Sequence, residues 1–218
     1  MSELPAGNRR ATELWPLVHA ERAALAEDLA DLTDEQWATP SLCEGLTVRE
    51  VLAHVSAGAG LGPMRWLAGV IRCRFDFDKQ VLLRLREQLG SSPAETLARF
   101  RDRVASTTKP PLPTLAMLGE VIVHGGDIRR PLGLHRDVPI DTLTTAAEYY
   151  GGSDQVVLAR GRVRDLRLAA TDGPFTTGPA DGPLVSGPTL ALIMAMTGRA
   201  AYCDDLEGAG VATLRSRS

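Results

Sequence analysis

The sequence has 218 residues, of which 44% are hydrophobic and 23% charged, a composition typical of a chain that buries a sizeable core. Its formal net charge is −3 and its basic residues are dispersed among acidic ones, which argues against a nucleic-acid partner. No stretch approaches the roughly 18 apolar residues that a membrane-spanning helix needs, and the first residues lack the apolar core of a signal peptide. We therefore predict a cytoplasmic protein without a membrane partner.

The three cysteines, Cys43, Cys73 and Cys203, are far apart in the sequence. Their odd number and wide spacing fit neither a disulfide framework nor a Cys-x-x-Cys metal motif. Cys43 could act as a nucleophile, but no histidine or other base accompanies it in the sequence. We interpret all three as reduced thiols.

Apolar residues recur at three- and four-residue intervals from residue 14 to residue 32, which predicts an amphipathic helix. Residues 33 to 46 contain Pro40 and Gly45 and are predicted to form a connecting loop, in which Trp37 serves as a buried plug.

Two later helix starts are marked by capping residues. Thr47 and Glu50 have the spacing of a capping box, and the helix that they begin contains His54. Ser92 and Pro93 have the pattern of an N-cap followed by proline in the first turn. Together with a further helix that begins at residue 114, these elements predict an up-down four-helix bundle over residues 8 to 155.

The composition changes from about residue 162. Apolar and polar residues alternate from 164 to 171, a Gly/Pro-rich segment follows, and residues 188 to 197 form a very apolar helical stretch. We predict a small α/β domain over residues 162 to 217, so that the fold class is mainly α with an α/β C-terminal domain.

The segment GEVIVHGGDI, residues 119 to 128, places Glu120 and His124 four positions apart. On a helix these side chains project in nearly the same direction, so they can present an oxygen and a nitrogen side by side. With His54 from a neighbouring helix they would form a Glu/His/His site with an open position, the arrangement of a catalytic zinc site. Nickel, manganese and ferrous iron accept the same ligands.

Alternatives to a metal site remain open at this point. Glu120 could pair with an arginine, and His124 could be a cation at a helix C-terminus, because two glycines follow it. Asp127 could accept the second ring N–H of His124, or it could be a solvated acid beside Arg129 or Arg130. The glycines could give a cofactor room to approach. The burial of Glu120 decides between a metal site and these alternatives, because an ionised carboxylate buried without a partner costs several kcal/mol.

Three blocks of the sequence resemble, in order and spacing, the mycothiol-dependent maleylpyruvate isomerase family of actinobacteria. The family belongs to the DinB-like four-helix-bundle metalloproteins. The blocks are PSLCEGLTVREVLAHVS (40 to 56), GEVIVHGGDIRRPLGL (119 to 134) and MTGRAAYCDDLEGAGVATLRSR (196 to 217). The resemblance runs from about residue 12 to the C-terminus and implies a small tail domain of the sterol-carrier type.

The resemblance implies a divalent metal, usually zinc, held by His54, Glu120 and His124, with mycothiol as the thiol cofactor. It also implies that Arg199, in the Thr-Gly-Arg of the third block, binds a carboxylate of the substrate or cofactor, which suits its planar guanidinium. The segment 61 to 90 has no counterpart in the pattern, and we expect it to line the mouth of the site.

We therefore predict a metal-dependent, mycothiol-using isomerase or S-transferase that acts on a small electrophile such as a maleylpyruvate-like acid, as a monomer or homodimer. The alternative is a non-catalytic metal-binding or small-molecule-binding protein of the same fold.

Overall fold

The computed structural model of the chain describes residues 11 to 218, so the first three residues of the predicted bundle domain lie outside the described part. The chain divides into two compact units, with the division after His135. None of the described helices combines the length and apolar content that crossing a membrane would require.

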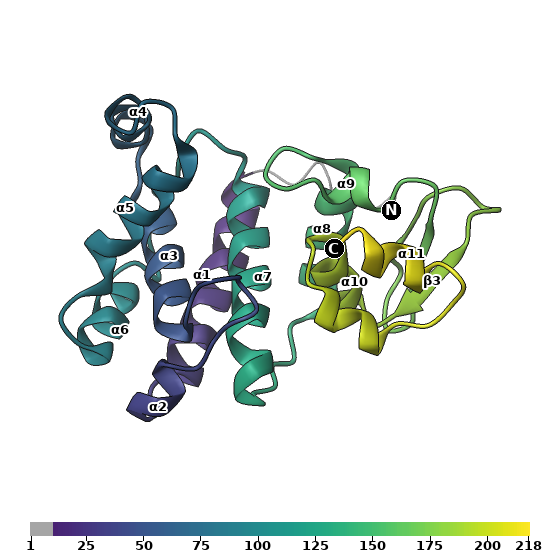
Figure 1. Cartoon of the computed structure of the whole chain (residues 1–218), viewed down its shortest axis with the longest axis horizontal. Helices are drawn as coiled ribbons and strands as arrows, with labels where there is room; N and C mark the ends of the chain where they lie inside the picture. The colour runs from purple at the N-terminus through teal and green to yellow at the C-terminus, as the bar shows by residue number, and fades with distance from the viewer. Residues whose placement is uncertain (1–10) are drawn as a thin grey trace. The chain divides into compact units, whose positions relative to one another are not determined.

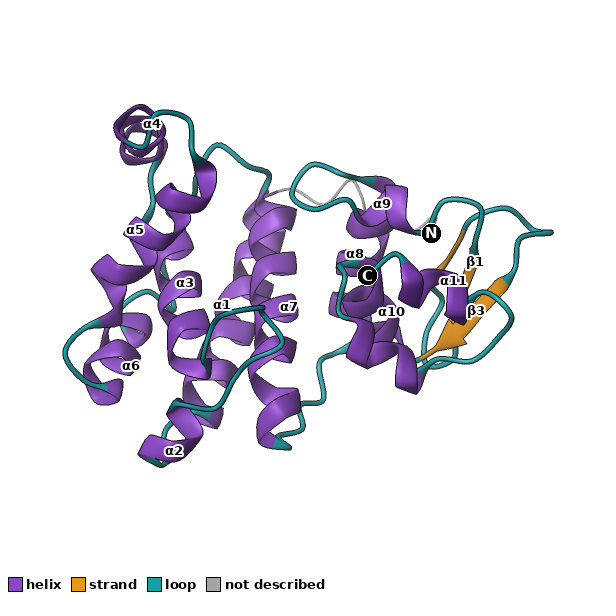
Figure 2. Cartoon of the chain, viewed as in Figure 1, coloured by secondary structure: helices purple, strands orange, loops and turns teal. Residues whose placement is uncertain are grey.

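The N-terminal unit is entirely helical (Figures 1 and 2). Its elements are α1 (Ala11–Asp28), α2 (Asp34–Trp37), α3 (Val48–Gly60), α4 (Pro63–Arg72), α5 (Phe77–Leu89), α6 (Pro93–Arg101) and α7 (Thr114–Leu132). α1 packs against α6 and α7, and α3 packs against the same two helices, which closes a four-helix bundle. α5 lies against α3 and α6, and α4 packs chiefly against α5. The predicted helical bundle is confirmed.

The bundle core is formed by apolar side chains from α1, α2, α3, α6 and α7. Buried members of this cluster include Leu25, Leu29, Trp37, Val51, Leu52, Phe100, Val121 and Ile128. Burial of such side chains supplies the main favourable free energy of folding and holds α3 and α7 in fixed register. The predicted plug, Trp37, is 5% exposed.

Local sequence signals fix where the helices start. Thr47 and Glu50 form the predicted capping box at the start of α3. Ser92 caps α6, with Pro93 in its first turn. A second capping box, formed by Thr33 and Gln36, begins the short helix α2 inside the segment that the sequence predicts as a loop. Side-chain oxygens satisfy amide groups that have no partner within the helix, which is why these residues mark helix starts.

The C-terminal unit contains α8 (Ile140–Gly152), α9 (Ala159–Arg162), β1 (Arg167–Ala170), β2 (Thr176–Thr177), β3 (Leu184–Gly187), α10 (Thr189–Met196), η2 (Ala200–Asp205) and α11 (Val211–Ser216). The strands form a sheet of order β2-β1-β3, in which β1 is antiparallel to β2 and parallel to β3 (Figure 2). The predicted small α/β architecture is confirmed.

The division between the units lies about 20 residues before the boundary that the sequence suggests. α8, which falls within the range of 8 to 155 predicted for the bundle, packs against α10 of the C-terminal unit. The reason is that α8 buries Leu143, Ala146, Ala147 and Tyr150, and periodicity shows that a helix has an apolar side but not which element covers it.

Candidate metal centre

α7 carries three of the predicted site residues. Glu120, His124 and Asp127 lie three and four positions apart, and the helix continues through both glycines to Leu132. It ends at Gly133, whose left-handed conformation (φ 66°) is typical of a helix C-terminus. His124 is therefore two turns inside the helix, which excludes the alternative of a cation at its C-terminus.

α3 supplies the fourth residue, His54. It lies in the second turn after the Thr47 cap, on a helix that packs directly against α7. Nε2 of His54 and Nε2 of His124 each lie 3.6 Å from the same oxygen, Oε2 of Glu120. The two imidazole rings meet edge to face with centroids 4.8 Å apart. Bundle packing thus brings together the three residues that the sequence singled out.

These separations have the dimensions of a metal site. At 3.6 Å the two N···O distances exceed those of hydrogen bonds. Tetrahedral ligands at about 2.1 Å from an ion are roughly 3.4 Å from each other. The donor atoms of His54, Glu120 and His124 all lie within 4.8 Å of one another, and the side chains of His54 and Glu120 are each 24% exposed. The cluster could therefore hold a divalent cation that is reachable from solvent.

Asp127 lies directly behind His124. Its Oδ2 is 2.9 Å from Nδ1 of the imidazole, and its side chain is fully buried. A carboxylate accepts hydrogen bonds, so the proton of this contact is on Nδ1, and a neutral ring would present its lone pair at Nε2, toward Glu120. The alternative of a solvated acid does not hold.

Arg22 on α1 is a buried cation near the cluster that the sequence interpretation missed. Only 2% of the residue is exposed, and Nη1 donates to the carbonyl of Ser106 at 2.8 Å. Burial lowers the pKa of Arg22 to about 10, and the negative charge of Glu120 opposes that change. The same attraction favours the ionised form of Glu120. Arg22 is one of several charged residues on an amphipathic helix, and no sequence signal distinguishes it from the others.

Cys43 also lies near His124. Its sulfur belongs to a second group of possible ligand atoms, with His124 and Asp127, within 4.8 Å of one another. The loop that carries it is attached to α7 by a hydrogen bond from the amide of Leu42 to the carbonyl of Asp127, 3.1 Å long. The three cysteines are free thiols, but a histidine does accompany Cys43 in space. Sequence spacing could not reveal this, because the two residues are 81 positions apart in the chain.

Gly125 makes room for an arginine rather than for a cofactor. A Cβ atom at this position would lie 2.6 Å from Nη1 of Arg129. Arg129 is 7% exposed, and its Nε donates to Oδ2 of Asp28 on α1 at 2.7 Å. The small residue beside His124 therefore lets α7 connect to α1.

Arg199 belongs to the C-terminal unit. It follows Gly198, which has a positive φ of 96°, and its Nη1 donates to the carbonyl of Thr197 at 2.7 Å. The pKa of the nearby Arg162 is lowered, first by burial and then by the charge of Arg199. The carboxylate-binding role of Arg199 that the resemblance implies stays a prediction.

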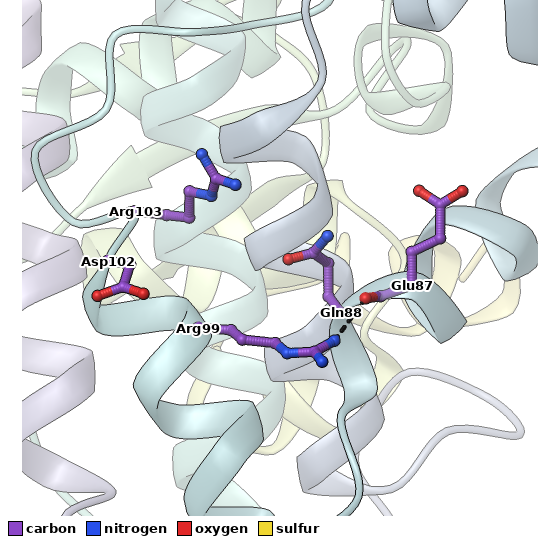
Figure 3. Close-up of a pocket in the computed structure, with 5 residues that line it drawn as sticks. All are labelled: Glu87, Gln88, Arg99, Asp102 and Arg103. Carbon is purple, nitrogen blue, oxygen red and sulfur yellow. Dashed lines mark hydrogen bonds between the residues drawn. The ribbon is translucent and has the colours of Figure 1, made fainter.

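A cavity of about 320 Å³ between α5 and α6 is lined by other residues (Figure 3). Arg99 crosses it, donating to the carbonyl of Glu87 at 2.6 Å and to the carboxylate of Glu95. These contacts join α5 to α6, and the cavity contains none of the candidate site residues.

The fold and the cluster define a class: a helical-bundle protein with a candidate metal centre between two of its helices and a small α/β unit. The sequence model of the mycothiol maleylpyruvate isomerase N-terminal domain matches residues 18 to 129, more than half of the chain. The chain belongs to this family, as the three sequence blocks imply.

Two solved structures have the same fold over nearly the whole chain. One is the crystal structure of the mycothiol-dependent maleylpyruvate isomerase, with 16% identity and a TM-score of 0.64. The other is a histidine-to-alanine mutant of that enzyme, with 15% identity and the same TM-score. In both cases 95% of this chain and 96% of the solved chain are covered. A search of curated proteins gave no match.

Proposed function

We propose that the chain is a divalent-metal-dependent enzyme that activates mycothiol for isomerisation of, or transfer to, a small electrophile such as a maleylpyruvate-like acid. The observation that carries the proposal is the placement of Nε2 of His54 and Nε2 of His124 at 3.6 Å from one oxygen of Glu120. Family membership and the shared fold support it.

The family resemblance favours zinc, and the donor set fits zinc without excluding the other metals. Two imidazoles and one carboxylate are the ligands of many catalytic zinc sites, which leave a position open, whereas nickel, manganese and iron accept the same set. When bound, such an ion would lower the pKa of the mycothiol thiol, so that the nucleophilic thiolate exists at neutral pH.

The other residues would prepare this site. Asp127 holds the Nδ1 proton of His124 and so keeps the lone pair of Nε2 directed at Glu120. In the absence of an ion, the positive charge of Arg22 favours the ionised form of Glu120. Arg199 would bind a carboxylate of the electrophile or of mycothiol through its guanidinium. An electrophile with an activated double bond would be isomerised, and one with a leaving group or epoxide would accept the thiol.

The direct test is metal analysis of the purified wild type and of a His124→Ala variant, with His135→Ala as the control. His135 is exposed and is not part of the cluster. We expect about one metal ion per chain in the wild type and control, and loss of the ion in His124→Ala. Equal metal content in all three proteins would overturn the site.

Turnover distinguishes the enzyme from a non-catalytic binding protein. Metal-loaded protein should consume maleylpyruvate or another small electrophile only when mycothiol is supplied, and Arg199→Lys should raise KM more than it lowers kcat. Tight uptake of mycothiol without turnover across a panel of electrophiles would support the non-catalytic alternative instead.

A further inference from the structure

The helices α4 and α5 expose an unusual concentration of apolar side chains. Of the ten large apolar side chains that are exposed in the described chain, seven lie between residues 64 and 82. They are Met64, Leu67, Ile71, Phe75, Phe77, Val81 and Leu82. Exposed apolar residues that are clustered, rather than scattered, mark interaction surfaces.

The apolar face of α4 is divided between burial and solvent. Trp66 and Val70 lie on the side that packs against α5, where the side chain of Gln80 donates to the carbonyl of Trp66 at 3.0 Å. Leu67 and Ile71, four positions apart, lie on the outer side and are 48% and 62% exposed. Figure 1 shows α4 at the periphery of the N-terminal unit. An amphipathic helix is thus fixed in place with apolar side chains facing solvent.

Unpaired arginines accompany these side chains. Arg72, Arg74 and Arg86 line a surface cavity of about 670 Å³ together with Leu82 and Leu83. Within the described part of the chain, none of the three arginines lies within ion-pair distance of a carboxylate. Residues 63 to 89 carry six basic and three acidic side chains, whereas the whole chain has a net charge of −3. The surface is locally cationic on an acidic protein.

The turn after α4 holds two of these residues in a backbone conformation that favours glycine. Arg74 and Phe75 have φ angles of 54° and 65°. The amide of Phe75 donates to Val70 and that of Arg74 to Ile71, which is the hydrogen-bond pattern of a Schellman motif. Phe75 is nevertheless 71% exposed. Strained backbone that displays a cation and an aromatic ring to solvent points to a function for those side chains.

We propose that the corner formed by α4 and α5 docks on an anionic lipid bilayer surface, which departs from the expectation of no membrane partner that the sequence alone suggested. The apolar side chains would enter the boundary between headgroups and acyl chains, and the three arginines would contact lipid phosphates, as in other interfacial amphipathic helices. Charge complementarity favours this occupant over a second copy of the chain, because a two-fold interface would put the same cationic surface on both sides. The corner binds at the surface of the bilayer and does not cross it.

The test is co-sedimentation of the full chain with vesicles of phosphatidylglycerol and, separately, of phosphatidylcholine. We expect binding to the anionic vesicles only, with loss as salt is raised. Arg72→Gln should weaken binding about fivefold, whereas Arg101→Gln, at an exposed arginine in the last turn of α6, should not. Ile71→Ser should weaken binding, and Leu158→Ser, at an equally exposed residue of the C-terminal unit, should leave it unchanged.

The variant Arg74→Gly distinguishes an effect on docking from an effect on folding. It removes a charge and relieves an unfavourable backbone conformation, so we expect weaker vesicle binding with a melting temperature no lower than that of the wild type. No binding to phosphatidylglycerol, or equal binding to both lipids, would overturn the proposal. Self-association that these substitutions abolish, or inorganic phosphate displacing the vesicles at low concentration, would also overturn it.

Discussion

Nδ1 of His124 lies 2.9 Å from Oδ2 of Asp127, three positions further along the same helix. Both residues are buried, so the hydrogen bond is shielded from competing water. It fixes the ring orientation and the tautomer before any ion arrives. The chain therefore builds the orientation of this imidazole into α7 itself.

Asp127→Asn should weaken metal binding about 10- to 100-fold, because the uncharged amide holds the His124 ring and its tautomer less firmly. Titration of metal-free protein with zinc measures the affinity. Asp31→Asn, at an exposed acid beyond the end of α1, is the matched control and should bind as the wild type does. Unchanged affinity in Asp127→Asn would show that the hydrogen bond has no part in metal binding.

Arg22→Met should lower stability and strengthen metal binding. The carbonyls of Ser106 and Arg103 lose a charged donor, at a cost of about 1–3 kcal/mol in the free energy of unfolding. Removal of a positive charge near Glu120 favours a divalent cation there. Chemical denaturation should thus show a lower free energy of unfolding, and zinc titration should show a higher affinity. A parallel loss of both would indicate that the variant disrupts the bundle as a whole.

Two glycine substitutions should have opposite effects on stability. Gly58→Ala, on α3 with open space around it, should raise the free energy of unfolding by roughly 0.5–1 kcal/mol, since alanine favours a helix. Gly125→Ala should lower it by roughly 1–2 kcal/mol, because the new methyl group displaces Arg129 from Asp28. Urea denaturation of both variants measures the difference, and stabilisation by Gly125→Ala would contradict the role of Arg129.

The cysteines should differ in their rates of alkylation. Burial raises the pKa of the Cys203 thiol, so a smaller fraction is thiolate at neutral pH than for an ordinary cysteine. Cys43 and Cys73 are half-buried and should react with iodoacetamide first. Mass spectrometry of partly alkylated protein measures the order, and the reaction at Cys203 should become faster as pH rises through its raised pKa. Early modification of Cys203 would contradict its burial.

The sequence predicted those features of the fold that depend on local interactions. The capping box at Thr47 and the proline at position 93 fix helix starts through groups only a few residues apart, so they could be read directly. The unit to which α8 belongs could not be read from the sequence in this way. Its apolar side packs against α10, which lies about 50 residues later in the chain. The small helix α2 was missed because its capping residues lie in a segment rich in loop signals.

The same distinction between local and long-range interactions applies to the candidate site. Glu120, His124 and Asp127 share one helix, and their spacing alone predicted a common side. The addition of His54 rested on a capped neighbouring helix and on the family pattern. Arg22 and Cys43 reach the site only through packing of α1 and of the loop before α3, which leaves no trace in sequence spacing. The roles of Arg199 and of segment 61 to 90 in binding the electrophile stay predictions.

His54 and His124 are 70 positions apart, and the chain between them contains α4, α5 and α6. An ion held by both would join the two ends of that segment, much as a disulfide does, and would reduce the conformational entropy of the unfolded chain wherever the ligands stay bound. Selective binding to the folded chain would also add about 2.7 kcal/mol of stability at a free metal concentration 100 times the Kd. The same three side chains would then serve as a reversible cross-link, and the availability of metal would set how long the bundle survives as well as whether it is active.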